Sequence, residues 1–303
     1  MMSGEPTIEP TPAEIFAEYR PLLFTVAYEI TGSVADAEDV VQDSWLRWAA
    51  VDPSEVLAPR AYLAKIATRL AINKLRSAAR RREDYVGPWL PEPVLTSPDV
   101  ADDVVLADSV SMAMLVVLET LTPDQRAVFV LHEVFGFSHP EIAAAVGKTE
   151  PAVRQILRRA RQQVLERRPA RAASAVGPAT DAVLQQFLVA ASTGDLQGLM
   201  DLLAPDVVLI TDGGGIKAAA LRPILGADKA ARFLVGVGAN KINGELRVEP
   251  ALFNSSAGSV VYIGGEADAV GTIEVVDDRI VAIYLVRNPE KFAGLDAPRI
   301  LSR

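Results

Sequence analysis

Apolar residues recur at every third or fourth position through the first half of the chain. The helices expected from this spacing cover residues 13–30, 34–48, 60–82, 111–121 and 122–135. Thr31-Gly32-Ser33 separates the first two, and a loop at 51–59 precedes the third. Four of the five helices carry polar residues on the opposite face, so they are expected to pack around a shared core.

The clearest pattern lies at residues 138–161, where a glycine separates two short helices. Ser138 and Glu141 have the spacing of a capping box, Gly147 can end the first helix, and Pro151 fits the first turn of the second. The expected buried stripe of the second helix is Val153, Ile156, Leu157, Ala160 and Val164. This pattern is typical of a DNA-binding helix-turn-helix, although a plain helical hairpin with a solvated basic face shares it.

The periodicity changes after residue 180. Two short helices broken at Gly194 come first, and a third is expected at 228–237. The expected strands cover residues 206–211, 246–253, 259–264, 269–276 and 279–286. Helices followed by a run of strands predict an α+β domain with a curved antiparallel sheet.

Proline-rich segments divide the chain into three domains. Pro88, Pro91, Pro93 and Pro98 prevent a long helix after residue 84, yet Trp89 among them is expected to pack on a neighbouring domain, because an exposed indole is costly. The predicted parts are a disordered N-terminus at 1–12, a helical bundle at 13–84, a linker at 85–110, a helix-turn-helix domain at 111–168, a linker at 169–179 and an α+β domain at 180–303.

The basic residues are clustered, although the 303-residue chain has a net charge of −9. Residues 56–82 contain eight Lys or Arg and no acid, and residues 148–171 contain eight more against two Glu. Two basic clusters on an acidic chain indicate two points of contact with nucleic acid.

Composition excludes several classes of protein. The absence of cysteine excludes disulfides and thiolate metal sites, and His132 and His139 are too few for a His-rich metal site. No apolar run approaches the roughly 20 residues that span a bilayer, and the N-terminus lacks a signal peptide. We expect a cytoplasmic protein that does not contact a membrane and needs no cofactor or metal.

Two predicted helices carry charged faces. On the second helix, Asp36, Asp39 and Asp43 share a face, with Glu38 and Gln42 beside them. This face is either merely solvated or binds a basic protein partner, since phosphate would repel it. On the third helix a basic stripe favours nucleic acid; it consists of Lys65, Arg69, Asn73, Arg76 and Arg80.

Three blocks, in this order, resemble an extracytoplasmic-function (ECF) RNA polymerase sigma factor. They are TGSVADAEDVVQDSWLRW, RAYLAKIATRLAINKLRSAARRRE and LTPDQRAVFVLHEVFGFSHPEIAAAVGKTEPAVRQILRRAR. The resemblance implies two all-α sigma domains, a region 2 helical bundle and a region 4 helix-turn-helix, that contact the β′ clamp helices and the β flap of core RNA polymerase. It assigns binding of core polymerase to Asp36, Glu38, Asp39, Gln42 and Asp43.

The resemblance also implies two promoter contacts. The residues assigned to the −10 element are Arg60, Tyr62, Lys65, Arg69, Asn73, Lys74, Arg76 and Arg80. Those assigned to the −35 element are Lys148, Thr149, Glu150, Arg154, Gln155, Arg158, Arg159 and Arg161. Tyr62 stands where many relatives carry Trp, and Asn73 where Asp is expected, which leaves the −10 sequence preference open.

The C-terminal domain resembles a SnoaL-like domain of the NTF2-like cone fold, in which a sheet wraps around a pocket. Its DGGG and NPEK segments, with the WLPEP linker, resemble the SigJ-like group of ECF sigma factors. In that group a fused SnoaL-like extension is thought to govern activity without a separate anti-sigma factor. The regulatory contacts implied are Trp89, Leu90, Pro91, Asp212, Gly213, Gly214, Gly215, Lys217, Asn288, Pro289, Glu290 and Lys291.

The expected function is promoter-specific transcription initiation, modulated by the C-terminal domain. The alternative is a ligand-responsive helix-turn-helix regulator that binds DNA without polymerase, but it leaves the acidic helix and the basic stripe unexplained. An enzyme would need an acid/base pair, and the carboxylates Asp212, Asp268 and Glu274 show no such spacing, so we expect none. The pocket is a candidate site for a small ligand.

Overall fold

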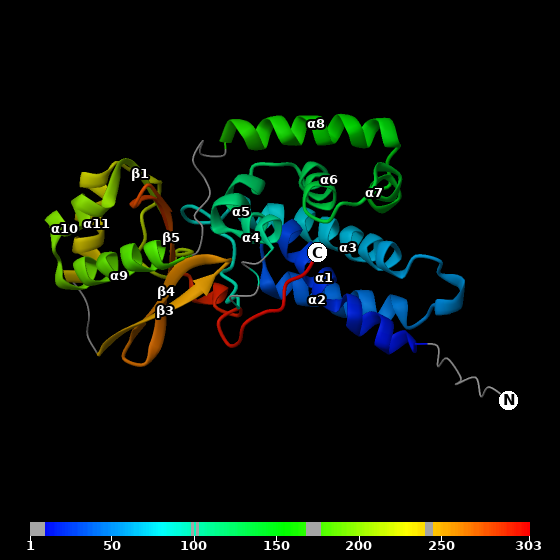
Figure 1. Cartoon of the computed structure of the whole chain (residues 1–303), viewed down its shortest axis with the longest axis horizontal. Coiled ribbons are helices and arrows are strands. Elements are labelled where there is room, and N and C mark those ends of the chain that lie inside the picture. The colour runs from blue at the N-terminus through cyan, green and yellow to red at the C-terminus, as the bar shows by residue number, and fades with distance from the viewer. Residues whose placement is uncertain (1–9, 98–99, 101–102, 168–176, 240–244) are drawn as a thin grey trace.

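The computed structural model describes residues 10–97, 100, 103–167, 177–239 and 245–303. Residues 1–9 of the N-terminus predicted to be disordered, and residues 169–176 of the second predicted linker, lie outside the described residues. The helices of the first half gather on one side of the molecule, and the α+β domain lies on the other (Figure 1).

The first three long helices form a bundle. They are α1 (Pro12–Thr31), α2 (Val34–Trp48) and α3 (Pro59–Glu83), and a short 3-10 turn at Pro53–Glu55 precedes α3. The predicted break at Thr31-Gly32-Ser33 is present: Gly32 ends α1 in the left-handed conformation at φ 71°, and the Ser33 side chain caps α2. Trp48 is fully buried, and its indole N–H donates to the Pro12 carbonyl at 2.7 Å.

Five helices follow, and the last four of them make the helix-turn-helix domain. They are α4 (Val104–Val110), α5 (Met112–Leu118), α6 (Pro123–Glu133), α7 (His139–Val146) and α8 (Glu150–Arg167). The capping box at Ser138 and the left-handed Gly147 are present as predicted. The linker predicted at 85–110 contains a short helix that was not expected, α4, which Asp103 caps and which buries Leu106 and Val110.

The C-terminal domain is α+β, as predicted. Its elements are α9 (Pro178–Thr193), α10 (Leu196–Leu202), β1 (Leu203–Asp212), β2 (Ile224–Leu225), α11 (Ala227–Ala239), β3 (Leu246–Phe253), β4 (Ser256–Ile263), β5 (Glu266–Val276), β6 (Arg279–Val286) and a 3-10 turn at Pro289–Lys291. The strand order is β2-β1-β6-β5-β4-β3.

The sheet is mixed, not antiparallel as predicted, because β1 runs parallel to β6. Strands β3 to β6 form an antiparallel meander, and its last strand returns beside β1. Strand β2 was not predicted, since two residues give no periodicity. Pairing of distant strands depends on the fold of the whole domain, so local alternation cannot fix its direction.

The two faces of β6 have different neighbours. Ile280 and Ile283 belong to the core formed with α9, α10 and α11, whereas Tyr284 and Val286 pack with Leu90 of the linker. Met112 and Ala113 of α5 complete the second cluster. The sheet therefore separates the interior of the C-terminal domain from its contact with the helical half.

The helical half has one continuous apolar core. Buried residues of α1, α2 and α3 belong to the same cluster as those of α5, α6, α7 and α8. Leu301, near the C-terminus, is 7% exposed and belongs to it as well. The bundle and the helix-turn-helix domain are thus packed against each other, and the chain's last residues return to both.

Candidate functional site

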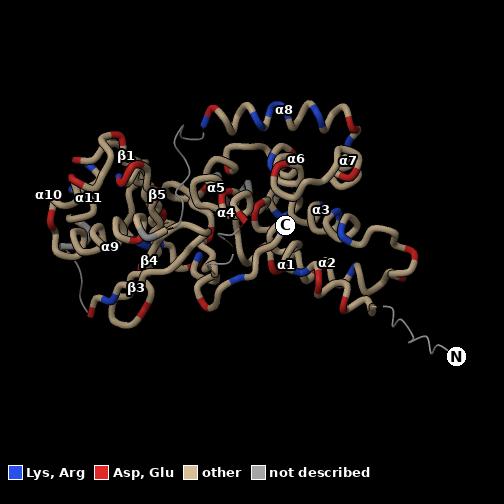
Figure 2. Tube along the Cα trace, viewed as in Figure 1, with Lys and Arg blue, Asp and Glu red and all other residues tan. Residues whose placement is uncertain are grey.

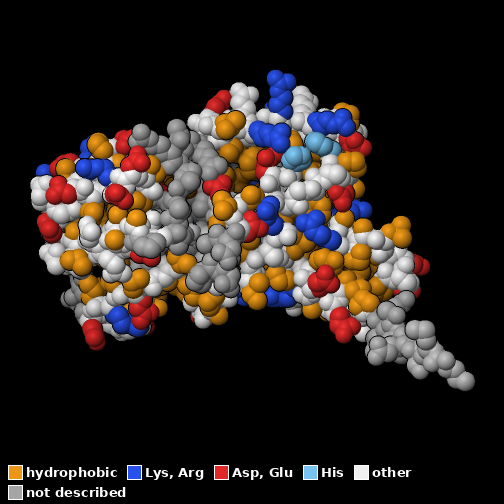
Figure 3. All heavy atoms as spheres, in the orientation of Figure 1, with side chains coloured by type: hydrophobic (Ala, Val, Ile, Leu, Met, Phe, Trp, Pro, Cys, Tyr) orange, Lys and Arg blue, Asp and Glu red, His pale blue; other side chains and the backbone are white. Residues whose placement is uncertain are grey.

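Helix α8 carries most of the residues predicted to contact the −35 element, and it lies at the edge of the molecule (Figure 1). Its arginine side chains stand out from the surface in Figure 3. The exposed members of the set are Thr149, Arg154, Gln155, Arg158, Arg159 and Arg161. Arg154 pairs with Glu150 at 2.9 Å and Arg161 with Glu133 at 2.6 Å, both within the same domain. This basic face is accessible.

The basic stripe of α3, unlike the basic face of α8, is in contact with another part of the protein, because the helix-turn-helix domain lies against it. Arg69 donates to the carbonyl oxygens of Ala144 at 2.8 Å and Ala145 at 3.0 Å, in the last turn of α7. Carbonyls in that turn lack partners within the helix and carry partial negative charge, so they suit a guanidinium. Arg60 donates to the Phe135 carbonyl at 3.1 Å.

Asp124 joins the two predicted promoter-binding surfaces. It lies in the first turn of α6 and pairs with Arg76 of α3 and with Lys148 before α8, both at 2.8 Å. Figure 2 shows α6 beside α7 and α3, with acidic and basic positions along these helices. One carboxylate thus neutralises a residue predicted for the −10 element and one predicted for the −35 element.

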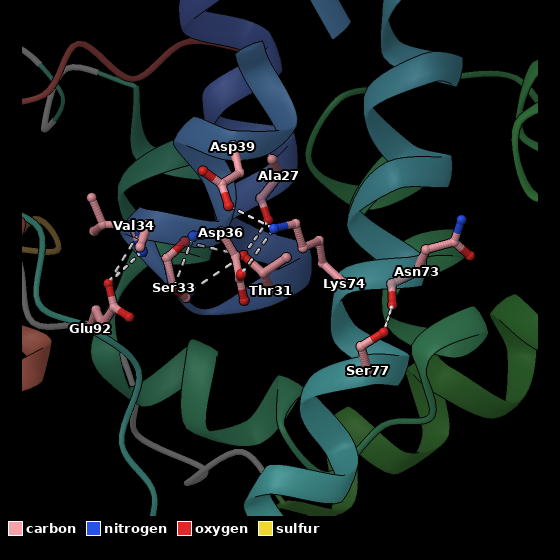
Figure 4. Close-up of polar contacts among 11 residues, drawn as sticks. Ala27, Thr31, Ser33, Val34, Asp36, Asp39, Asn73, Lys74, Ser77 and Glu92 are labelled. Carbon is pink, nitrogen blue, oxygen red and sulfur yellow. Dashed lines mark hydrogen bonds and ion pairs between the residues drawn. The ribbon is translucent and has the colours of Figure 1, made fainter. Parts of the chain in front are cut away.

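The other predicted −10 residues have varied surroundings. Tyr62 and Lys65 are half-buried, and the Tyr62 ring lies 6.0 Å from that of Trp48. Asn73 is exposed, and its backbone carbonyl accepts a hydrogen bond from the Ser77 hydroxyl (Figure 4). The side chain of Arg80 lies outside the described residues.

Lys74 bonds to the acidic face of α2. Its Nζ lies 2.6 Å from Asp39 and 3.7 Å from Asp36, and the hydrogen bond to Asp39 raises the pKa of Lys74 (Figure 4). A residue predicted to bind DNA is therefore paired with two predicted to bind polymerase. Gln42 and Asp43 are exposed on the same helix.

The chain's C-terminal segment reaches the acidic face. Glu38 accepts from Arg20 at 2.8 Å and from Arg299 at 2.7 Å, and the Arg299 guanidinium lies 5.7 Å from the centre of the Phe24 ring. The Ser302 amide donates to the Thr25 hydroxyl at 3.1 Å. One of the predicted polymerase-binding side chains is thus held by the tail of the same chain.

The linker is clamped by a buried ion pair of the C-terminal domain. Lys291 Nζ lies 2.7 Å from an Asp212 oxygen, with side chains 3% and 0% exposed. Asp212 accepts from the Leu90 amide at 2.8 Å and from the Tyr85 hydroxyl at 2.5 Å. Lys291 also donates to the Leu90 carbonyl and lies 3.2 Å from the centre of the Trp89 ring. We call these five residues the linker clamp.

The neighbouring predicted regulatory residues divide into two groups. Asn288 donates to the Tyr85 hydroxyl at 2.9 Å, and Gly214 leaves no room for a side chain, since an added Cβ would lie 2.4 Å from Asn288. Lys217 does not reach the linker; it pairs with Asp268 at 2.9 Å on another side of the domain.

A second contact between the domains centres on Asn254, which follows β3 with φ 56°. Its amide nitrogen donates to the Tyr28 hydroxyl at 2.6 Å and the Val110 carbonyl at 3.0 Å, and its oxygen accepts from the Val94 amide at 3.0 Å. One buried side chain therefore connects α1, α4 and the linker to the sheet. Glu92 completes the linker's docking by accepting from the Val34 amide at 2.7 Å (Figure 4).

A buried carboxyl lies where α1 meets the helix-turn-helix domain. Glu29 is fully buried, accepts from the Ser109 hydroxyl at 2.8 Å, and its second oxygen has no partner among the described residues. Burial raises the pKa of Glu29 to about 8, although the Ser109 hydrogen bond and the Arg126 charge lower it. The carboxyl is therefore protonated at neutral pH.

Replacing Glu29 with glutamine is expected to flatten the pH dependence of stability. Since the pKa of Glu29 is raised on folding, its contribution is complete below an unfolded pKa of 4.5 and is lost as pH rises to about 8. The slope reaches about 1.4 kcal/mol per pH unit. Urea unfolding of wild type and Glu29→Gln between pH 4.5 and about 8 measures this slope. Burial also raises the pKa of Glu92, but both proteins contain Glu92, so its effect cancels in the comparison. Parallel curves would contradict the prediction.

Several functional residues escaped the sequence analysis. Tyr85 could have been included, since it belongs to the same aromatic segment as Trp89. Asn254, Arg299 and Asp124 gave no signal, because nothing in a local pattern shows which distant side chain a surface residue meets. No described helix is both long enough and apolar enough to cross a membrane, and no cluster of metal-ligating side chains occurs among the described residues.

Known proteins resemble both halves of the chain. Residues 15–81 match Sigma-70 region 2, and residues 111–164 match Sigma-70, region 4. The ECF RNA polymerase sigma factor SigJ of Mycobacterium tuberculosis is 41% identical in an alignment of 295 positions that covers 92% of this chain and 92% of its own. The crystal structure of the M. tuberculosis sigma factor SigJ matches 94% of this chain and 99% of that one, with a TM-score of 0.73 and 36% identity. The probable ECF sigma factor SigI of that species is 34% identical, covering 70% of this chain and 71% of its own.

Proposed function

This chain belongs to the extracytoplasmic-function family of RNA polymerase sigma factors, and we propose that the arrangement described above is its resting state. It is a non-enzymatic factor that binds core RNA polymerase and directs initiation at specific promoters. A ligand-responsive regulator that acts without polymerase is not favoured, because such a protein has no need of region 2. The proposal keeps domains at residues 13–84, 111–168 and 180–303.

The observation that carries the proposal is the packing of region 4 on the basic stripe of α3. Arg69 is bonded to α7, Arg76 to Asp124, and Arg60 to the Phe135 carbonyl, so three residues assigned to the −10 element are bonded to region 4. A melted promoter strand needs these cations for its phosphates. Region 4 must therefore move away from α3 before both promoter elements can be bound.

The acidic face of α2 is proposed to bind the β′ clamp helices, with Asp36, Asp39 and Asp43 as its charged residues. Region 4 is assigned to the β flap and the −35 element. Exposure of Gln42 and Asp43 supports the first assignment, and exposure of the basic face of α8 supports the second. Arg299 on Glu38 and Lys74 on Asp39 have to be displaced by the partner.

We further propose that the C-terminal domain holds this state without a separate anti-sigma factor. The linker clamp fixes the segment between regions 2 and 4, and Asn254 contacts region 2 at Tyr28 and the end of α4, directly before region 4, at Val110. The tail adds a contact with region 2 through Arg299 and one with region 4 through Arg303, which donates to the Val134 carbonyl. The restraint is intramolecular, so its effective concentration does not depend on a second protein.

Replacing Asp124 with asparagine is expected to favour opening. The change removes one partly exposed ion pair between regions 2 and 4, with Arg76, and one within region 4, with Lys148, while leaving every assigned DNA contact in place. At up to about 1 kcal/mol for the pair with Arg76, transcription in vitro with core polymerase should rise up to about fivefold at limiting factor.

Glu133→Gln is the matched control, because it removes a similar charge from a pair with Arg161 that lies wholly within region 4. It should leave transcription within about twofold of wild type. Equal transcription from Asp124→Asn and wild-type factor would contradict a closed resting state.

Replacing Asp43 with lysine tests the assigned polymerase surface. A positive charge on this exposed acidic face should raise the Kd for core polymerase at least about tenfold at low salt, since like charges at an interface cost several kcal/mol. Fluorescence anisotropy of labelled factor with core polymerase measures the Kd. Asp206→Lys changes the net charge equally on the C-terminal domain, so equal weakening by both variants would refute a specific site on α2.

A further inference from the structure

The C-terminal domain encloses a cavity that the packing of the sigma regions does not use. It has a volume of about 590 Å³ and lies between α9, α11 and the inner face of the sheet. Apolar side chains make up most of its wall, including Phe187, Leu188, Phe233, Val261 and Leu285. The space is far larger than the voids left by ordinary side-chain packing, and such cavities are where small molecules bind.

The space exists partly because small residues stand where larger ones would fit. Gly271 faces Leu285 across the β5–β6 ladder, and an added Cβ there would lie 3.5 Å from the Leu285 side chain, which is ordinary contact. Gly271 is not in a left-handed conformation, so backbone geometry does not require glycine. A side chain at this position is therefore tolerable, and it would occupy the cavity.

Charge is confined to one part of the wall. Asp268 and Arg287 are the charged residues lining the cavity in the described part of the chain, and they pair at 2.7 Å. Lys217 binds the other Asp268 oxygen at 2.9 Å. Burial raises the pKa of Asp268, but the hydrogen bonds and charges of Lys217 and Arg287 outweigh it and leave that pKa below its usual range. The group carries two positive charges against one negative, a surplus that suits an anion.

We propose that this cavity binds a small amphipathic carboxylic acid, whose carboxylate pairs with Arg287 and Lys217 and whose apolar body fills the space beneath α9 and α11. Arg287 has donors to spare, since its described bonds, to Asp268 and the Ala218 carbonyl, use two of its five N–H groups. A ligand carboxylate would complete a group of two cations and two anions. The apolar body would gain about 25 cal/mol for each Å² removed from water.

The site is connected to the linker clamp through the backbone. The Arg287 and Asn288 amides donate to the Asp212 carbonyl at 2.6 and 3.0 Å, and the Asp212 side chain holds the Leu90 amide. Leu285 and Arg287 line the cavity, whereas Tyr284 and Val286 of the same strand pack on Leu90. Arg287, which the ligand would contact, is adjacent in the chain to Val286 and Asn288, and both of these contact the linker. In this respect the inference deepens the proposed resting state and rests on it.

Decanoate is the probe, titrated below its micelle concentration into the full-length chain and followed by calorimetry. Decanol, which has the same apolar body and no charge, is the matched ligand. Decanoate should bind at least about tenfold more tightly than decanol. Lys217→Gln, at a lysine 41% exposed, should weaken decanoate binding several-fold and leave decanol unchanged. Failure of wild type to bind decanoate, or equal affinity for the two ligands, would overturn the proposal.

Gly271→Leu tests the location, since it fills the cavity from β5. It should abolish decanoate binding while unfolding at the wild-type denaturant concentration or above it. Undiminished binding to a folded Gly271→Leu protein would place the ligand elsewhere and refute the site. If this variant does not fold, the decanol comparison and Lys217→Gln still decide the proposal.

Hydrogen exchange of the Leu90 amide tests the connection to the clamp. Decanoate should change its exchange rate several-fold in wild type and not in Gly271→Leu; an unchanged rate at saturation would contradict the coupling. These measurements contain no polymerase. Their failure therefore leaves the resting-state proposal standing, whereas failure of the Asp124→Asn experiment leaves the ligand site standing.

Discussion

Replacing Lys291 with methionine is expected to lower the free energy of unfolding by about 3–5 kcal/mol, because it leaves the fully buried Asp212 carboxylate without its cation. Methionine keeps the apolar stem but loses the bond to the Leu90 carbonyl and the charge over the Trp89 ring. The linker should then separate from the C-terminal domain early in guanidinium unfolding. Intrinsic fluorescence, to which Trp89 contributes, and circular dichroism would record the two steps.

The size of this effect is predicted to depend on burial and not on charge alone. Lys217→Met removes a Lys–Asp pair on the same domain whose lysine is 41% exposed, so it should cost less than about 1 kcal/mol. Adding Asp212→Asn to Lys291→Met should cost less than the two single changes together, since the uncompensated charge is gone. Additive effects, or equal costs for Lys291→Met and Lys217→Met, would show that the clamp does not stabilise the fold in this way.

Replacing Asn254 with glycine is expected to cost about 2–6 kcal/mol. Glycine accepts the backbone angle, φ 56°, so the loss isolates the side chain. Without it the buried Val94 amide and Val110 carbonyl lose their partner, at about 1–3 kcal/mol each, whereas the Tyr28 hydroxyl keeps the Glu92 carbonyl. Urea unfolding gives the cost, and the variant should expose the linker to limited proteolysis.

Asp278→Gly serves as the control for Asn254→Gly. Asp278 also has a positive φ, 59°, but it is exposed in the turn between β5 and β6. Its replacement should change stability by less than about 1 kcal/mol in either direction. A similar loss from both variants would mean that backbone flexibility, not the three hydrogen bonds, explains the effect at Asn254.

Elements with local causes were predictable. The Gly32 and Gly147 helix ends, the Ser138 capping box and the stripe through Val153 and Leu157 are as expected, because each depends on residues within a turn or two of one another. Helix α4 was missed for the opposite reason. Its Asp103 cap is local, but its seven residues are stable only because Leu106 and Val110 are buried against distant helices.

The residues of the candidate surfaces were predictable from the sequence, but whether they are free to bind a partner was not. Charge spacing placed Arg69 and Arg76 on one basic stripe and Asp39 on an acidic face, and the resemblance assigned that face to polymerase binding. In the folded protein each of these groups is bonded to a distant part of the chain. Arg69 bonds to α7 carbonyls, Arg76 to Asp124, and Asp39 to Lys74. The periodicity of the sequence does not predict these contacts, because their partners lie far apart in the chain.

The sequence by itself determined the order of parts, the helix-turn-helix and the α+β class of the last domain, because caps, glycine turns and apolar periods act over a few residues. Only the tertiary structure decided that region 4 lies on α3, that β1 runs parallel to β6, and that Lys291 and Asp212 hold the linker. These depend on contacts between residues up to about 200 positions apart, as between Lys291 and Leu90. Such contacts form when the whole chain buries its apolar surface, so local sequence cannot specify them.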